Sequence, residues 1–232
     1  MAPTTAAAPL RYAAAMHIER TIQVSTHGRY LADIVERDGP RPLLVGFHGY
    51  AEQAAIQLAR LQAVRGDLPL DLVAIQGLHR FYRSGGEELA ASWMTREDRD
   101  LLIADNVAYV DAVVGAVAHE FGDPRSVLFS GFSQGASMAY RAAVLGRVVP
   151  AGVIALGGDV PPELTHAQLG RLPRVLIGWG VRDGFYDEEK RAADESRLRE
   201  AGVDVTVLEL DAGHKWTDAF TAGVAAWLRP LA

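Results

Sequence analysis

From residue 20 onward, short apolar runs alternate with longer segments whose apolar residues recur at helical spacing. The runs at residues 43–47 and 152–156 are wholly apolar, which is typical of strands buried on both faces of a sheet. Strands that alternate with helices form βαβ units around a mostly parallel sheet. Ligands bind such sheets at the carboxyl ends of the strands, so the residues that follow each strand are the first candidates for function.

The pattern predicts an α/β fold with a mostly parallel central sheet, helices on both faces and an antiparallel N-terminal hairpin. The hairpin is expected from residues 21–24 and 31–35, with its turn at His27-Gly28. Further strands are expected at residues 43–47, 72–75, 126–130, 152–156, 174–177 and 203–210. Helices are expected at residues 52–64, 97–121, 134–145, 187–200 and 215–228, and a long polar loop at residues 76–92.

No internal repeat or linker divides the 232 residues, which predicts one domain over residues 17–232 after an N-terminal extension of residues 1–16. The chain has no cysteine, which excludes disulfides, zinc–thiolate sites and a thiolate nucleophile. With 23 basic and 29 acidic side chains, the net charge is −6, and no basic tract is present. This balance argues against a nucleic-acid partner, because such proteins neutralise phosphates with clustered cations.

The alanine-rich start is interrupted by Pro9, Arg11 and Tyr12, whereas a secretory signal has a continuous apolar core. We therefore expect a loose extension, although a weak leader stays an alternative. No run reaches the roughly 18 apolar residues that a membrane helix needs, so no membrane span is expected. The lack of cysteine is compatible with a reducing compartment and favours a cytoplasmic location.

The strongest motif is Gly131-Phe132-Ser133-Gln134-Gly135, which stands between the strand at 126–130 and a helix rich in small residues. This is the G-x-S-x-G pattern in the strand–turn–helix setting that exposes a nucleophilic serine. Glycine is needed on both sides because the turn is sharp and strained. The alternative is a glycine-rich turn without chemistry, but the placement favours Ser133 as the nucleophile.

A serine nucleophile needs an adjacent, oriented base. Among the seven histidines, His214 follows the last expected strand and precedes the last helix, which places it on the same sheet edge as Ser133. We therefore expect His214 to be the base. Four other histidines are expected at the surface, in the extension, a turn, a helix and a loop: His17, His27, His119 and His166.

The acid should follow a strand between the serine and the histidine, where it would hold the imidazole tautomer. Asp183 fits, because it comes directly after the strand at 174–177. Asp159, after the strand that ends at residue 156, is the main alternative. Asp187 is interpreted as a helix-start residue, where the helix dipole favours a carboxylate.

A tetrahedral intermediate also needs two N–H donors for its oxyanion. One is the backbone N–H of Gln134, the residue after the nucleophile. The strand at 43–47 runs into His48-Gly49-Tyr50, and we expect the N–H of Tyr50 to be the second donor. His48 is interpreted as a structural residue that braces this loop.

Together these segments resemble the carboxylesterase/phospholipase branch of the α/β-hydrolases, which includes the acyl-protein thioesterases. The resemblance covers about residues 42–230. It is carried by Phe47-His48-Gly49-Tyr50, Ser92-Trp93, Gly131-Phe132-Ser133-Gln134-Gly135, Gly180 with Asp183, and Gly213-His214. It implies an esterase or thioesterase without cofactor or metal, whose triad is Ser133, Asp183 and His214.

The chain departs from the family's pattern near the approach to the serine. The family tends to have Gly-Asp where this chain has Ala51-Glu52, Trp-Phe-Asp where it has Trp93-Met94-Thr95, and Pro where it has Tyr186-Asp187. These departures affect the expected substrate more than the chemistry. Five side chains are candidates for the pocket walls, of which Trp93 and Phe185 are the main expectations for substrate binding: Trp93, Met94, Phe185, Tyr186 and Trp216.

The sequence therefore predicts a serine hydrolase that cleaves a small-molecule carboxylic ester or thioester through an acyl-enzyme. Two alternatives stay open at this point. One is a ligand-binding or sensing protein on the same fold, because fold alone does not determine function. The other is an acyltransferase that passes the acyl group to an alcohol. The loop at residues 79–83 is a candidate cap over the site.

Overall fold

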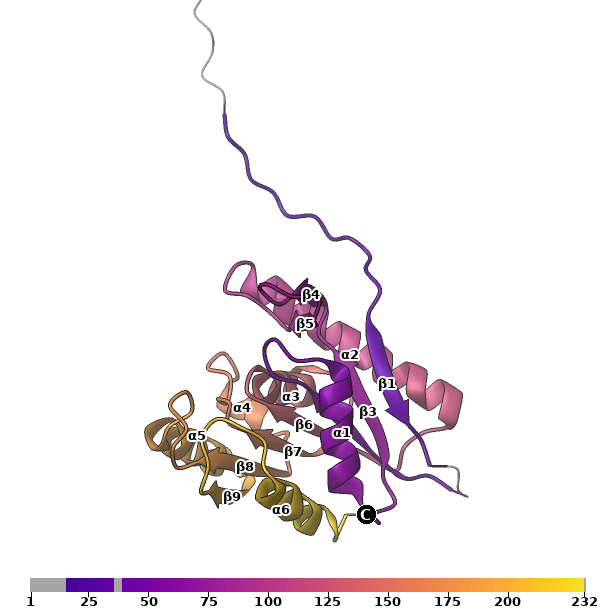
Figure 1. Cartoon of the computed structure of the whole chain (residues 1–232), viewed down its shortest axis with the longest axis vertical. Coiled ribbons are helices and arrows are strands. Elements are labelled where there is room, and N and C mark those ends of the chain that lie inside the picture. Colours follow the sequence, from indigo (N-terminus) through magenta and orange to yellow (C-terminus); the bar gives the residue numbers. More distant parts are fainter. Residues whose placement is uncertain (1–15, 36–38, 232) are drawn as a thin grey trace, which may run out of the picture.

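The computed structural model describes residues 16–35 and 39–231, so most of the expected N-terminal extension lies outside the described residues. Its centre is a seven-stranded sheet of order β1-β3-β2-β6-β7-β8-β9 (Figure 1). All neighbours are parallel except β1 and β3, which are antiparallel. The strands are β1 (Arg29–Asp33), β2 (Pro42–Phe47), β3 (Asp71–Gln76), β6 (Ser126–Phe132), β7 (Pro150–Leu156), β8 (Arg174–Gly180) and β9 (Asp204–Leu210).

Helices cover both faces of the sheet. One face carries α1 (Ala54–Arg65) and α6 (Asp218–Leu228), which contact each other. The other carries α2 (Arg99–Phe121), α3 (Gln134–Leu145), the short α4 (His166–Leu169) and α5 (Glu188–Glu200). The predicted α/β class, the mostly parallel sheet and the two helical layers are confirmed.

The pleat of β2 shows why an unbroken apolar run is needed at the centre of the sheet. Leu43, Val45 and Phe47 belong to the core under α2 and α3, whereas Leu44 belongs to the core under α1 and α6. Successive strand residues point to opposite faces. In a strand that is covered on both faces, every side chain therefore faces an apolar core.

The predicted N-terminal hairpin is wrong. Residues 16–28 form no regular secondary structure, and Ile22 and Val24 are exposed. The start of this segment runs away from the body of the molecule (Figure 1), whereas its end contacts β4 (His79–Tyr82), where Arg80 donates to the carbonyl oxygen of His27 at 3.2 Å. The second expected strand is present as β1, but it pairs with β3 through register contacts such as Leu31 with Ala74. The partner of β1 is therefore the buried strand β3 and not residues 21–24, which the sequence had suggested.

The expected polar loop at residues 76–92 contains two strands, which is a second correction. These are β4 (His79–Tyr82) and β5 (Leu89–Ser92), which form a separate antiparallel pair. Ala51 and Glu52 exchange backbone hydrogen bonds with Ala91 of β5. The hairpin therefore supports the loop after β2.

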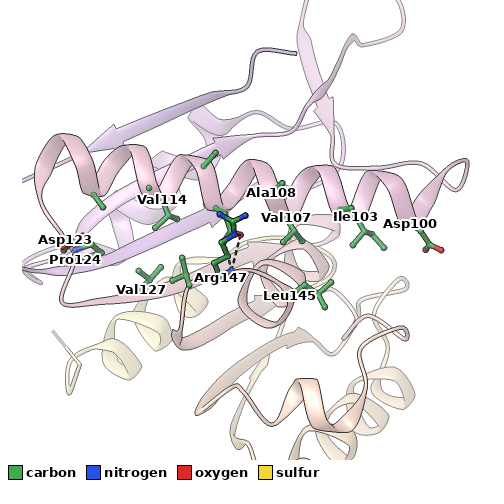
Figure 2. A pocket seen from close by; sticks show the side chains of 16 residues that line it. Asp100, Ile103, Val107, Ala108, Val114, Asp123, Pro124, Val127, Leu145 and Arg147 are labelled. Carbon is green, nitrogen blue, oxygen red and sulfur yellow. Dashed lines mark hydrogen bonds and ion pairs between the residues drawn. The ribbon is translucent and has the colours of Figure 1, made fainter. Parts of the chain in front are cut away.

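Helix α2 is the one helix among the described residues that is long and apolar enough to cross a membrane by length and composition alone. Its valines contribute to the core above the sheet. The helix borders a groove of about 770 Å³, whose wall includes apolar residues such as Ile103, Val107 and Leu145 (Figure 2). Arg147 lies over this groove, where its backbone N–H is bound by Asp111.

Candidate active site

Ser133 stands at a strained turn between β6 and α3. Its φ of 55° and ψ of −121° lie outside the regions that side-chain-bearing residues favour. A Cβ on Gly131 would come 2.1 Å from the carbonyl oxygen of Gly135, and a Cβ on Gly135 would come 2.2 Å from that of Phe47. The two glycines of the motif are therefore required by close packing, as the sequence pattern indicated.

The structure brings Ser133, His214 and Asp183 into one hydrogen-bonded series. The Nε2 atom of His214 lies 2.9 Å from the hydroxyl oxygen of Ser133, and its Nδ1 atom lies 2.7 Å from a carboxylate oxygen of Asp183. The three residues follow β6, β8 and β9, whose carboxyl ends share one edge of the sheet. Residues up to 81 positions apart thus meet at this edge.

The Asp183 carboxylate is held by its own loop. One oxygen accepts the backbone N–H groups of Phe185 at 2.8 Å and Tyr186 at 3.0 Å. The other oxygen is left to accept from His214. Because the side chain of Asp183 is only 2% exposed, water does not compete for either oxygen. This arrangement fixes the imidazole so that Nδ1 carries the proton and Nε2 can accept one.

The loop of Asp183 is supported from behind by Asp194 of α5. One carboxylate oxygen of Asp194 accepts the backbone N–H of Val160 at 2.9 Å and the hydroxyl of Tyr186 at 3.1 Å. Burial raises the pKa of Asp194 to about 6. No feature of the sequence pointed to this residue, since it lies on a helix rich in charges of both signs.

The two expected oxyanion donors are available. Within the described residues, neither the backbone N–H of Tyr50 nor that of Gln134 has a hydrogen-bond partner. Gln134 is the first residue of α3, so its N–H also lies at the positive end of the helix dipole. Both residues line the same cavity as Ser133.

The segment after β5 connects these two donors. The indole N–H of Trp93 donates to the carbonyl oxygen of His48 at 2.9 Å, just before the Gly49-Tyr50 turn. The backbone N–H of Trp93 donates to the side-chain oxygen of Gln134 at 3.0 Å, and the Gln134 amide donates to the carbonyl of Met94 at 3.0 Å. A single buried residue therefore contacts the loops of both donors.

His48 braces the loop after β2, as the sequence suggested. Its Nδ1 atom lies 2.8 Å from the carbonyl oxygen of Gly49, and its Nε2 atom accepts the backbone N–H of Gly77 at 2.9 Å. Burial lowers the pKa of His48, which keeps the ring neutral in this pair of contacts. A neutral, doubly bound ring is suited to support rather than to proton transfer.

The cavity above Ser133 has a volume of about 540 Å³. Aromatic side chains form much of its wall, and the imidazole of His214 lies between the rings of Phe132 and Phe185 with both centroids 5.0 Å away. Phe185 is 73% exposed, so it stands at the rim. The cavity is also lined by Tyr50, Gln134, Ser137, Gly157, Gly158, Asp159, Tyr186 and Lys190.

Three expectations about the surroundings of the site are corrected. Trp93 is completely buried behind the site and does not line the cavity, because its indole packs on Phe47 and His48. Trp216 also lies outside the cavity lining, against Phe220. The expected cap at residues 79–83 leans on the loop of Tyr50 through Phe81 instead of lining the cavity.

The alternative candidates lie apart from the hydrogen-bonded series. Asp159 is exposed in the cavity wall, and its backbone carbonyl accepts from Ser137. Asp187 caps the start of α5, where it accepts the backbone N–H of Lys190 at 3.0 Å. The four histidines expected at the surface are exposed: His17, His27, His119 and His166. Over residues 16–35 and 39–231, no group of acidic or histidine side chains could hold a metal ion.

The structure is similar to several solved esterases. Esterase PE8 matches with a TM-score of 0.69 and 23% identity over 88% of this chain and 98% of that chain. The carboxylesterase of Bacillus cereus matches with a TM-score of 0.70 and 16% identity over 88% and 94%. The carboxylesterase of Mesorhizobium loti matches with a TM-score of 0.68 and 22% identity over 82% and 90%.

At these identities the similarity shows the fold, which is that of the α/β-hydrolases. Among curated proteins no sequence match was found. The phospholipase/carboxylesterase family model matches residues 88–222, more than half of the chain, and this stretch includes Ser133, Asp183 and His214. The chain therefore belongs to the phospholipase/carboxylesterase family of α/β-hydrolases.

Proposed function

We propose that this protein is a serine carboxylesterase that hydrolyses a small carboxylic ester or thioester through an acyl-enzyme. The observation that carries the proposal is the unbroken hydrogen-bonded series from Asp183 through His214 to Ser133 beneath a cavity with two free N–H donors. A serine hydroxyl is a weak nucleophile unless a base accepts its proton, and this series supplies an oriented base.

In the proposed reaction, the Ser133 oxygen attacks the substrate carbonyl carbon while Nε2 of His214 accepts the hydroxyl proton. The negative oxygen of the tetrahedral intermediate accepts hydrogen bonds from the N–H groups of Tyr50 and Gln134. His214 then gives its proton to the leaving alcohol or thiol, and the acyl group stays on Ser133. Water that His214 deprotonates attacks this acyl group, and collapse of the second intermediate releases the acid and restores the serine.

Asp183 stabilises the imidazolium in both steps by holding the Nδ1 proton, and it keeps its own charge throughout. The walls favour a compact substrate, since Phe132, Phe185 and Tyr186 surround a cavity of about 540 Å³. One similar structure, YahD, was solved with malic acid, at 16% identity and a TM-score of 0.66. Carboxylic acids are the products that the proposed reaction would release.

A fluorophosphonate probe tests the proposal directly, because it reacts with activated serines. We expect rapid labelling of the folded protein, loss of labelling after heat denaturation, and a modified peptide that contains Ser133. A panel of esters and thioesters of different acyl length would be assayed beside it. Absence of both labelling and hydrolysis would favour a binding protein, and faster transfer to an added alcohol than to water would favour an acyltransferase.

A further inference from the structure

Glu52 and Arg60 form a partly buried ion pair beside the proposed site. Two guanidinium nitrogens of Arg60 bind the two carboxylate oxygens of Glu52 at 2.7 and 2.8 Å. Their side chains are 16% and 17% exposed. Burial alone would raise the pKa of Glu52, but the hydrogen bonds and charge of Arg60 outweigh it and lower that pKa, so the carboxylate stays ionised.

The Glu52 side of the pair controls the turn that carries the Tyr50 donor. The carboxylate accepts the backbone N–H of Gly49 at 2.8 Å, and the backbone N–H of Glu52 donates to the Gly49 carbonyl at 3.2 Å. Ala51 has a φ of 58°, which a side-chain-bearing residue adopts only when its surroundings hold it there. The carboxylate thus holds the residue before Tyr50, which lines the cavity and whose own N–H has no partner among the described residues.

The Arg60 side of the pair contacts the aromatic residues next to the nucleophile and the base. Its guanidinium lies 4.9 Å from the ring centroid of Phe132 and 5.4 Å from that of Trp216. Phe132 precedes Ser133 in the chain and stacks against the His214 imidazole. Cation–π contacts of this kind are worth most where water is partly excluded, as it is here.

We infer that the Glu52–Arg60 pair is a positioning element, which holds the Tyr50 donor and the aromatic wall of His214 in one fixed arrangement around Ser133. This inference rests on the proposed function. It also gives a role to Glu52, one of the positions at which the chain departs from the family's usual residues. Neither residue touches the reacting atoms, so their removal should lower the rate of the chemical step more than the affinity for substrate.

The same helix supplies a matched control. Arg65 of α1 binds Asp33 of β1 with two hydrogen bonds of 2.9 and 3.0 Å, and these side chains are 18% and 26% exposed. This pair has the same chemistry and similar burial, but the contacts to the Gly49 amide and to the rings of Phe132 and Trp216 belong to the Glu52–Arg60 pair. Its loss therefore reports the general cost of breaking a partly buried ion pair of α1.

The test compares Glu52→Gln, Arg60→Met and the double variant with Arg65→Met. Each would be measured for its unfolding midpoint, for kcat and KM on one activated ester, and for the rate of fluorophosphonate labelling. We expect the Glu52 and Arg60 variants to lose about 10- to 100-fold in kcat and in labelling rate, with KM changed by less than about threefold. Arg65→Met should keep kcat within about twofold.

The double variant covers the case in which a single variant unfolds, because it leaves no unpaired buried charge. We expect it to fold and to show the same loss of kcat. Arg60→Lys, which keeps the charge without the two-point contact, should recover only part of the activity. If the folded variants match Arg65→Met in kcat and labelling rate, the positioning role is wrong. If the unaltered protein neither labels nor hydrolyses, the proposed function fails instead.

Discussion

Two hollows of the structure differ in size and in chemistry. The groove along α2 has about 770 Å³, whereas the cavity above Ser133 has about 540 Å³. Apolar residues make up most of the wall of the larger groove, where Figure 2 shows Ile103, Val107 and Leu145. Its charged lining residues are Asp100, Asp111, Asp123 and Arg147. The smaller cavity holds a serine, a histidine and two free N–H donors, so convergent polar groups identify the candidate site better than volume does.

The topology of the sheet explains why polar groups converge in one hollow and not in the other. Loops after β6, β8 and β9 meet at the carboxyl edge of the parallel sheet, and each contributes one residue to the hydrogen-bonded series of Ser133, Asp183 and His214. The groove is lined by residues of α2, of the start of β6 and of the end of α3, so it does not lie at the carboxyl ends of the strands. Side chains there are dictated by packing, which selects valine, leucine and alanine.

The sharpest test of this contrast is Ser133→Ala. We expect hydrolysis of short p-nitrophenyl esters to fall to background, because the nucleophile is lost, while the unfolding midpoint stays close to that of the unaltered protein. Ala108→Glu, an exposed change in the α2 groove, is the matched control and should keep kcat/KM within about twofold. Retained hydrolysis in the serine variant, or its loss in the groove variant, would reverse the roles of the two hollows.

The next largest effect is expected inside the smaller cavity. Asp183→Asn should lower kcat by about 10³- to 10⁴-fold, because the amide favours the wrong imidazole tautomer. Asp159→Asn, in the cavity wall, should change kcat by only a few fold, since its carboxylate does not contact His214. Steady-state kinetics of the two variants separate the carboxylates, and a larger loss in the Asp159 variant would identify it as the acid.

A smaller effect is expected from Trp93→Phe, which removes the N–H that holds the His48 carbonyl. If Trp93 braces the donor loops, kcat should fall by about tenfold for every acyl chain length, because the geometry of the oxyanion donors loosens. If it formed a pocket wall, KM would change with chain length instead. Trp227→Phe on α6, which lies outside the cavity lining, controls for the loss of a partly buried indole and should leave kcat unchanged.

The smallest effect concerns stability. Since the pKa of Asp194 rises from 3.8 to about 6 on folding, the folded state binds its proton more tightly than the unfolded state. The contribution of this group to stability is therefore complete below about pH 4 and is lost as the pH rises through about 6. Asp194→Asn does not titrate, and its single amide oxygen can still accept from Val160 and Tyr186.

Relative to the unaltered protein, Asp194→Asn should gain on the order of 1–2 kcal/mol in unfolding free energy between pH 4.5 and pH 7.5. Urea unfolding of both proteins at the two pH values measures this difference. A variant that instead loses relative stability as the pH rises would mean that the carboxylate is ionised and stabilising in the fold.

Much of the candidate site could be predicted because its residues follow strands. Gly131-Phe132-Ser133-Gln134-Gly135 has a local steric meaning, and Asp183 and His214 stand directly after apolar runs. Once those runs are assigned to a parallel sheet, their carboxyl ends must share an edge. The positions of Ser133, Asp183 and His214 were therefore expected before their distances were known.

The wrong predictions arose where a residue's partner is distant in the chain and the local pattern is ambiguous. Residues 21–24 alternate like a strand, but the partner of β1 is β3, about 43 residues further along. Trp93 was expected in a pocket wall, although an aromatic residue is more often part of the core. Which of the two it serves depends on the backbone around it, here the carbonyl of His48.

The amino-acid sequence by itself determined the order of the parallel strands and the long helices, the strained turn at Ser133 and the positions of Asp183 and His214 after their strands. These follow from local sterics and from periodicity, which depend on near neighbours. Only the tertiary structure decided which side chains support the site, namely the link of Trp93 to Gln134, the pair of Glu52 with Arg60, and Asp194 behind the acid loop. Such contacts join different elements, and their hydrogen bonds exist only after the whole sheet has assembled.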